Sequence, residues 1–230
     1  MQARLDNVFW HALTGAQAKF AAGKGTVRRY APGFSPIAAF ADPAEPDFAA
    51  LAAYVAPGET VYLDGVAGPL PAGWRVDVET SMFKMLWTGG TCTVESGFVP
   101  TPLGATHRVE AEALAALTRP GPFGPRTIEL GDYFGVFADG RLVAMAGERA
   151  HVGSLREVSG VCTHPEHQGR GHARRLMAYL VNRHQARGET SFLHVMSANA
   201  GARAMYARMG FRDYREVTVR AVAWAGDVRS

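Results

Sequence analysis

Apolar positions between residues 155 and 181 change from the spacing of a strand to that of a helix. The apolar residues of the expected strand are Leu155, Val158, Val161 and Cys162. The residues at helical spacing, three or four positions apart, are Ala173, Leu176, Met177, Leu180 and Val181. Gly169 and Gly171 lie between the two patterns. The sequence therefore predicts a strand, a glycine-bearing turn and the N-terminus of a helix.

Residues 1–104 are predicted to form a small mixed α/β subdomain. The expected elements are a helix over 6–20 broken near Gly15, a helix over 48–55, and strands over 26–30, 37–40, 60–63 and 76–87. Pro100 and Pro102 disfavour both a helix and a central strand, so residues 98–104 are predicted to be a linker.

Residues 105–230 are predicted to form a second α/β domain. Its expected elements are a helix over 107–117, a hairpin of strands 133–137 and 142–147, the strand, turn and helix above, and a strand over 191–196 followed by a helix. Asp139-Gly140 is a strong hairpin signal. The order strand, strand, strand, helix, strand, helix, strand makes the fold class α/β, mixed α+β.

The turn before the second-domain helix has the properties of an anion site. The first N–H groups of a helix have no intrahelical partner, and the helix dipole adds partial positive charge there. Glycines at 169 and 171 allow close approach of a ligand and positive φ. A P-loop would need Gly-Lys followed by Ser or Thr, which does not occur, and a dinucleotide fingerprint would need a small residue at Arg174.

The remaining pattern, Gln168-x-x-Gly171-x-Ala173, resembles the Q/R-x-x-G-x-G/A signature of the GNAT superfamily of acyl-CoA-dependent N-acyltransferases. Glu157 lies eleven residues before Gln168, where many members carry a general base. The run from Asn199 to Phe211 is similar to the second motif of that family, N-x-x-A-x-x-x-Y-x-x-x-G-F. The resemblance covers residues 105–230 and implies a GNAT fold that uses acyl-CoA, most simply acetyl-CoA.

The resemblance also implies the site residues. The donor pyrophosphate would lie on Gln168, Gly169, Arg170, Gly171, His172 and Ala173, and the pantetheine arm on the backbone of Val161, Cys162 and Thr163. Asn199 would either contact the pantetheine or cap its own helix.

Glu157 and Tyr206 are the expected catalytic residues. By strand alternation, Glu157 shares a face with Ser159, Val161 and Thr163, and partial burial is expected to raise its pKa for use as a base. The alternative is an ion pair with a nearby arginine, with Glu148 as the next candidate base. Tyr206 would protonate the departing thiolate, although its helix also places it at core spacing.

An extra half before the acyltransferase half resembles the arrangement of the glycine N-acyltransferase-like branch, and residues 1–104 are expected to be a degenerate copy of the fold. This favours the amine of a small molecule as acceptor. A protein amine is the alternative, and a non-catalytic acyl-CoA sensor is the alternative of a different class. A homodimer is left open.

Charge is divided unevenly along the chain. Residues 1–104 carry 7 basic and 9 acidic side chains, a net of −2, whereas residues 105–230 carry 17 arginines and 12 acids, a net of +5. The donor-binding half is therefore the cationic half, which suits a ligand with several phosphates. The longest basic runs are the pairs Arg28-Arg29 and Arg174-Arg175, which argues against nucleic acid as a partner.

The remaining composition narrows the environment of the protein. Two cysteines, Cys92 and Cys162, are too few for a disulfide framework, and a buried reduced thiol is expected at Cys162. No apolar run approaches the roughly 20 residues of a membrane span, and the N-terminus lacks the apolar segment of a signal peptide. We expect a cytoplasmic protein that contacts no membrane. No metal is expected, because no further His or Cys stands at ligand spacing from His164 and His167.

Overall fold

The computed structural model describes residues 2–94 and 97–226, which form one continuous sheet with helices on its faces. The strands are β1 (Ala21–Ala22), β2 (Val27–Tyr30), β3 (Ile37–Phe40), β4 (Thr60–Asp64), β5 (Trp74–Trp87), β6 (Thr101–Leu103), β7 (Tyr133–Ala138), β8 (Arg141–Val152), β9 (Leu155–Thr163), β10 (Thr190–Met196) and β11 (Phe211–Trp224). The helices are α1 (Gln2–Asp6), α2 (Val8–Thr14), α3 (Phe48–Ala52), α4 (Arg108–Thr118), α5 (His172–Ala186) and α6 (Ala200–Met209), with 3-10 turns η1 (Ala18–Phe20), η2 (Ala105–His107), η3 (Thr127–Glu129) and η4 (Pro165–His167).

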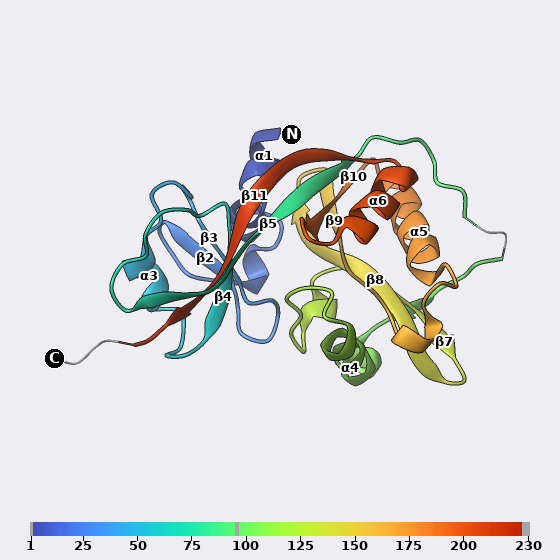
Figure 1. Ribbon diagram of the computed structural model, residues 1–230, viewed down its shortest axis with the longest axis horizontal. Helices are drawn as coiled ribbons and strands as arrows, with labels where there is room; N and C mark the ends of the chain where they lie inside the picture. Colours follow the sequence, from blue (N-terminus) through green and yellow to red (C-terminus); the bar gives the residue numbers. More distant parts are fainter. Residues whose placement is uncertain (1, 95–96, 227–230) are drawn as a thin grey trace.

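The spatial order of the strands is β1-β2-β3-β4-β11-β5-β10-β9-β8-β7-β6. The long strands β5 and β11 cross between the two halves, as Figure 1 shows. β11 pairs with β4 of the N-terminal half, and β5 pairs with both β11 and β10 of the C-terminal half. The two halves thus share one sheet, and α2 of the N-terminal half packs against β8 of the C-terminal half.

The sequence predictions of element type and order are confirmed. The interruption near Gly15 falls between α2 and η1, and the hairpin turn at Asp139-Gly140 has positive φ at both residues, 49° and 75°. The linker prediction was incomplete, because residues 101–103 form β6 and pair with β7. β6 is the edge strand of the sheet, so Pro102 does not remove a hydrogen bond between central strands.

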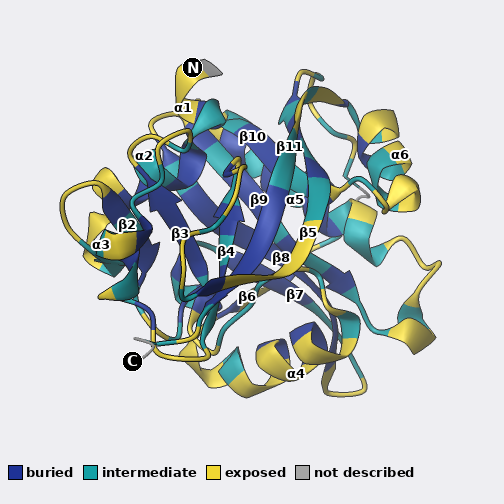
Figure 2. Cartoon of the chain, turned by 60° about the vertical axis from the view of Figure 1, so that its left-hand side comes forward, coloured by how far each residue is buried: buried dark blue, intermediate teal, exposed yellow. Residues whose placement is uncertain are grey.

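Apolar faces of α5 and α4 pack on opposite faces of the C-terminal sheet. The α5 residues that are completely buried are Leu176, Met177, Leu180 and Val181, at the spacing seen in the sequence. α4 buries Ala111, Leu114 and Ala115 on the other face, around Tyr133 and Cys162. Figure 2 shows the buried residues gathered on the central strands, while the outer faces of α3, α4 and α6 are exposed.

None of the helices in residues 2–94 and 97–226 has the length and apolar character needed to cross a membrane.

Candidate active site

The turn between β9 and α5 has the backbone geometry of an anion site. Gly169 and Gly171 both have φ of 75°, and Gly171 is the N-cap of α5 without a side-chain cap. Arg175 N–H donates to the Gly171 carbonyl at 3.1 Å, so the amides of residues 172–174 precede the first closed helical turn. The Gln168 N–H already donates to the Pro165 carbonyl at 3.3 Å, so the amides of residues 169–173 are the ones placed to bind phosphate oxygens.

Positive side chains surround this turn. Arg170 and Arg174 are exposed, and together with Thr93, Gly171 and Arg175 they line a pocket of about 350 Å³. Burial, followed by the charges of Arg175, His167 and Arg170, lowers the pKa of His172. Arg170, Arg174 and Arg175 place three positive charges beside the turn, so the residues present suit the phosphates of acetyl-CoA.

Beside the turn, the sheet opens between two parallel strands. β9 and β10 pair only at Leu155–Thr190, Arg156–Ser191 and Glu157–Phe192. Beyond Glu157, β9 keeps its pairing with β8 while β10 keeps its pairing with β5. The edge of β9 that faces β10 is therefore open from residue 158 onward, and an extended arm with amide groups can pair with it.

A β-bulge changes the direction of the side chains within this open stretch. Met145 pairs with Cys162 and Gly147 with Ser159, so β9 has one extra residue near Gly160, whose φ is 62°. As a result, Val158 and Val161 pack in the same apolar cluster under α5, whereas Cys162 faces α4. The prediction that Glu157, Ser159, Val161 and Thr163 share one face was wrong, because alternation does not continue through a bulge.

Val161, Cys162 and Thr163 lie on the open edge of β9, and their contact with a pantetheine arm stays a prediction. The Cys162 side chain is buried on the α4 side, where burial raises the pKa of its thiol to about 11. Both Cys92 and Cys162 are free thiols, as expected. The Cys162 thiol is thus a core group, and only its backbone faces the opening.

Glu157 is completely buried at the last paired position of β9 and β10. Its Oε1 accepts from Arg149 Nη2 at 2.5 Å and lies 2.7 Å from His194 Nδ1, while its Oε2 accepts from Arg149 Nε at 3.0 Å and from the Ala150 N–H at 3.2 Å. Burial alone would raise the pKa of Glu157, but the charges and hydrogen bonds of Arg149 and His194 lower it to about 2. The expectation of a raised pKa was wrong, and the predicted alternative, an ion pair with an arginine, is present.

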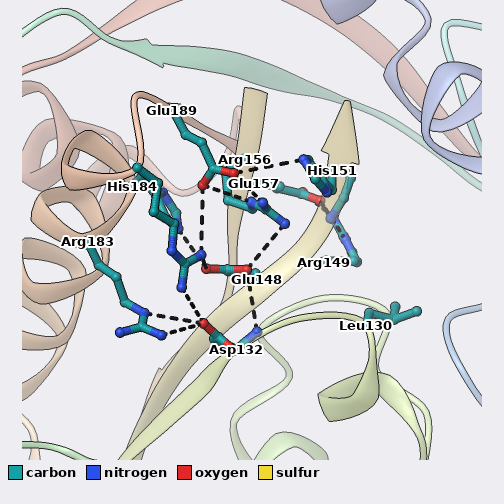
Figure 3. Close-up of polar contacts among 12 residues, drawn as sticks. Leu130, Asp132, Glu148, Arg149, His151, Arg156, Glu157, Arg183, His184 and Glu189 are labelled. Carbon is teal, nitrogen blue, oxygen red and sulfur yellow. Dashed lines mark hydrogen bonds and ion pairs between the residues drawn. The ribbon is translucent and has the colours of Figure 1, made fainter. Parts of the chain in front are cut away.

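Glu148, the other candidate base, belongs to a separate network at the far end of α5 (Figure 3). Its carboxylate lies 3.1 Å from His184 Nε2 and 3.2 Å from Arg187 Nη1, and His184 Nδ1 lies 2.8 Å from Ser191 Oγ. His184 and Ser191 are completely buried, and both ring nitrogens of His184 are engaged, so this Ser-His-Glu arrangement leaves no nitrogen free to act on a substrate. It fixes the end of α5 against β8 and β10.

Tyr206 and Asn199 lie on α6, on the α5 side of the sheet. Tyr206 is 8% exposed, packs edge-on to Phe211 in the cluster under α5, and its pKa is raised by burial to about 12. Its hydroxyl therefore keeps its proton at neutral pH. Asn199 Oδ1 accepts from the Ala202 N–H at 3.1 Å, so the predicted helix cap is formed.

Three residues that the sequence patterns did not single out complete the polar cluster: Arg149, His194 and Tyr133. His194 Nε2 and the Tyr133 hydroxyl are buried, and neither has a hydrogen-bond partner in the described part of the chain. Tyr133 lies over Gly147 and beside the bulge, because a Cβ on Gly160 would be 3.0 Å from its ring. A polar residue inside the apolar run 191–196 is the signal that could have drawn attention to His194.

No group of three His, Cys, Asp or Glu side chains within residues 2–94 and 97–226 is arranged to hold a metal ion.

A sheet that opens between two parallel strands beside a glycine-bearing helix N-terminus defines the fold class as that of the GNAT acetyltransferases, which use acetyl-CoA as donor. Residues 133–221 match the family model of FR47-like proteins. No curated protein matches the sequence. A crystal structure from Novosphingobium aromaticivorans, assigned to the GNAT family of acetyltransferases, is 36% identical with a TM-score of 0.87, and the match covers 96% of this chain and 98% of that chain.

More distant structures share the fold. A GCN5-related N-acetyltransferase from Kribbella flavida is 19% identical with a TM-score of 0.57, over 98% of this chain and 95% of that chain. A GCN5-related N-acetyltransferase-like protein from Streptococcus suis is 15% identical with a TM-score of 0.55, over 96% of each chain. The chain belongs to the GNAT family of acetyltransferases, and the similarity to the Novosphingobium protein includes the N-terminal half.

Proposed function

We propose that this protein transfers the acetyl group of acetyl-CoA to the primary amine of a small molecule. The observation that carries the proposal is the juxtaposition of the phosphate-binding turn with the open edge of β9. The pyrophosphate would lie on the amides of residues 169–173, with Arg170 and Arg174 adding positive charge. The pantetheine amides would pair with Val161, Cys162 and Thr163, which brings the thioester to the bulge at Gly160.

The reaction proceeds by direct attack of the amine on the thioester carbonyl. The N–C bond forms, the C–S bond breaks with its electron pair on sulfur, and the amine proton leaves. A backbone N–H near Val161 would stabilise the oxyanion, and the Tyr206 hydroxyl would protonate the thiolate. Glu157 is the base expected from the sequence, but a carboxylate with four donors and a pKa of about 2 is a weak proton acceptor at neutral pH.

The arrangement of two halves supports the preference for a small amine. The N-terminal half contributes α2 and β2 to the face of the sheet on which Glu157 lies, since Phe9, Tyr30 and Phe192 share one apolar cluster. This face is enclosed by both halves, as it would be in the glycine N-acyltransferase-like branch. An extended protein segment would need an open groove there.

A second candidate is a non-catalytic acyl-CoA sensor. The observation that favours it is that Glu157 and Tyr206 both occupy stabilising positions, one in an ion pair and the other in a packed cluster. A sensor binds acetyl-CoA without consuming it, so turnover separates the two functions.

The experiment measures CoA release from acetyl-CoA with a panel of small primary amines and with peptides that carry a free α-amine or lysine. The proposal predicts release that depends on a small amine. Release with peptides alone would assign a protein acceptor, and binding of acetyl-CoA without release for any amine would assign the sensor.

A further inference from the structure

The imidazole of His194 presents one nitrogen to Glu157 and leaves the other without a partner. Its side chain is 6% exposed, and Nδ1 lies 2.7 Å from Glu157 Oε1. An ionised carboxylate can only accept, so Nδ1 donates to Glu157, and in the neutral form of the imidazole the lone pair is therefore on Nε2. In the described residues no group donates to Nε2, and a buried acceptor left without a donor costs roughly 1–3 kcal/mol.

The orientation of this ring is fixed on several sides. His194 stacks on Phe9 of α2, with ring centroids 5.4 Å apart and an interplanar angle of 19°, and meets Phe192 edge-on at 5.8 Å. Glu157 is held in turn by Arg149 and by the Ala150 N–H, and Figure 3 shows the carboxylate beside the Arg149 side chain. The direction of the Nε2 lone pair is therefore set before any substrate binds.

The place of His194 along β10 puts it at the opening of the sheet. Glu157 and Phe192 are the last residues that pair between β9 and β10. His194 is two residues further along β10, on the same face as Phe192, where the two strands have separated. A thioester that follows the edge of β9 to the bulge at Gly160 would have its carbonyl on this side of the opening.

We propose that His194 is the general base of the acetyl transfer and that Glu157 is the positioning residue that sets its tautomer; this inference rests on the proposed function. The Nε2 lone pair takes a proton from the amine nitrogen as the N–C bond forms. The C–S bond then breaks, the thiolate takes the Tyr206 proton, the imidazolium releases its proton to solvent, and the Tyr206 phenolate takes a proton back from solvent. Each proton and electron pair is accounted for without a further reactant.

The charges near His194 come from both halves of the protein. Lys84 pairs with His194 across β5 and β10, and its ammonium is held by Asp64 at 2.6 Å and by the carbonyls of Leu5 and Asp6. The titratable and charged groups that face this cluster are Asp6 on α1, Tyr30 on β2, Asp64 on β4, Lys84 on β5, Tyr133 on β7, Arg149 on β8 and Glu157 on β9. The pH profiles of wild type, His194→Asn and its control are therefore compared with all of these groups in place, and Glu157→Gln then changes one of them alone.

His194→Asn is the test variant, because its amide can still donate toward Glu157 but has no basic lone pair. With an amine that the wild type consumes, kcat at pH 7 should fall by about 10²- to 10⁴-fold while the KM for acetyl-CoA stays unchanged. The deficit should narrow as the pH approaches the pKa of the amine. His151→Asn is the matched control, since His151 is half-buried on neighbouring β8 with its Nε2 3.0 Å from the Gly153 carbonyl, and it should keep wild-type rates.

The variant Glu157→Gln distinguishes a role of Glu157 in positioning His194 from a purely structural role. If Glu157 sets the tautomer of His194, the acidic limb of the profile of kcat against pH should move in the folded variant. A purely structural role of Glu157 would lower the melting temperature and leave that limb in place. Nitrogen NMR of wild-type protein labelled with ¹⁵N-histidine gives an independent readout, in which a protonated Nδ1 and a bare Nε2 are expected at pH 7. The His194 signals are assigned by nuclear Overhauser contacts to the ring of Phe9, whose centroid is 5.4 Å away, and by their loss in His194→Asn where that variant folds.

The outcomes distinguish the two proposals. Turnover by wild type with less than a threefold change in His194→Asn overturns His194 as the base and leaves the acetyltransferase function standing. A protonated Nε2 in the wild type overturns it as well, even if His194→Asn does not fold. Binding of acetyl-CoA without CoA release for any amine overturns the proposed function and the base together.

Discussion

Replacement of Glu157 by Gln should cost several kcal/mol of stability in a way that depends on pH. The pKa of the folded carboxyl is about 2, against an ordinary value of 4.5. A difference of about 2.5 units at 1.36 kcal/mol per unit corresponds to about 3 kcal/mol. Because the folded pKa lies below the unfolded one, this contribution is complete above about pH 5 and is lost as the pH falls toward 2.

The variant also leaves the Arg149 guanidinium buried without its counter-charge. Loss of one partner of a buried pair typically costs about 3–5 kcal/mol. Urea unfolding at pH 7 should therefore show a loss of at least about 3 kcal/mol for Glu157→Gln, and the difference from wild type should shrink between pH 5 and pH 3. Glu79→Gln is the matched control: the Glu79–Arg220 pair has a carboxyl side chain that is 52% exposed, so its loss should cost under about 1 kcal/mol.

A difference between wild type and Glu157→Gln that is constant from pH 7 to pH 3 would refute the lowered pKa. A loss under about 1 kcal/mol at pH 7 would refute the buried ion pair itself. Either result would also remove the basis for Glu157 as the residue that orients His194.

Two further changes separate catalysis from packing on α6. Tyr206→Phe keeps the ring against Phe211 and deletes the hydroxyl, so kcat should fall with the KM for acetyl-CoA unchanged; full activity would leave Tyr206 as a core residue. Asn199→Ala removes the cap on the Ala202 N–H and should cost about 1 kcal/mol in urea unfolding, with no change in acetyl-CoA affinity. A weaker affinity in that variant would place Asn199 at the pantetheine.

Local patterns were sufficient to predict most of the elements and the turn before α5, but not the short strands β1 and β6. The turn at Gly169 and Gly171 follows from residues adjacent in sequence, and the apolar spacing of α5 points to the buried face that the structure has. The bulge at Gly160 was not predictable in this way, because the alternation of apolar residues is similar with or without one extra residue. Because the bulge was not anticipated, strand alternation assigned Val161 and Cys162 to the wrong faces of the sheet.

The polar cluster could be predicted only in part because its members meet through long-range pairing. Glu157 was found from its distance to Gln168, but the sequence says nothing of which cation it faces. Arg149 contacts Glu157 across the β8–β9 hairpin. His194 contacts Glu157 only because β10, which follows the connection through α5, is parallel to β9. The pairing of β5 with both β10 and β11 likewise depends on contacts between the two halves.

The proposed function depends on the binding of acetyl-CoA at the N-terminus of α5, and this binding can be measured directly. Titration calorimetry and thermal unfolding would be compared for wild type, Gly171→Glu and Gly188→Glu. Both glycines have left-handed φ, 75° and 72°, with open space around the Cβ position, but Gly188 lies beyond the C-terminal end of the same helix. We predict that acetyl-CoA binds and stabilises both the wild type and Gly188→Glu. Gly171→Glu should fold but lose both binding and stabilisation, because its carboxylate repels the phosphates. Equal binding of acetyl-CoA by all three proteins would contradict this prediction.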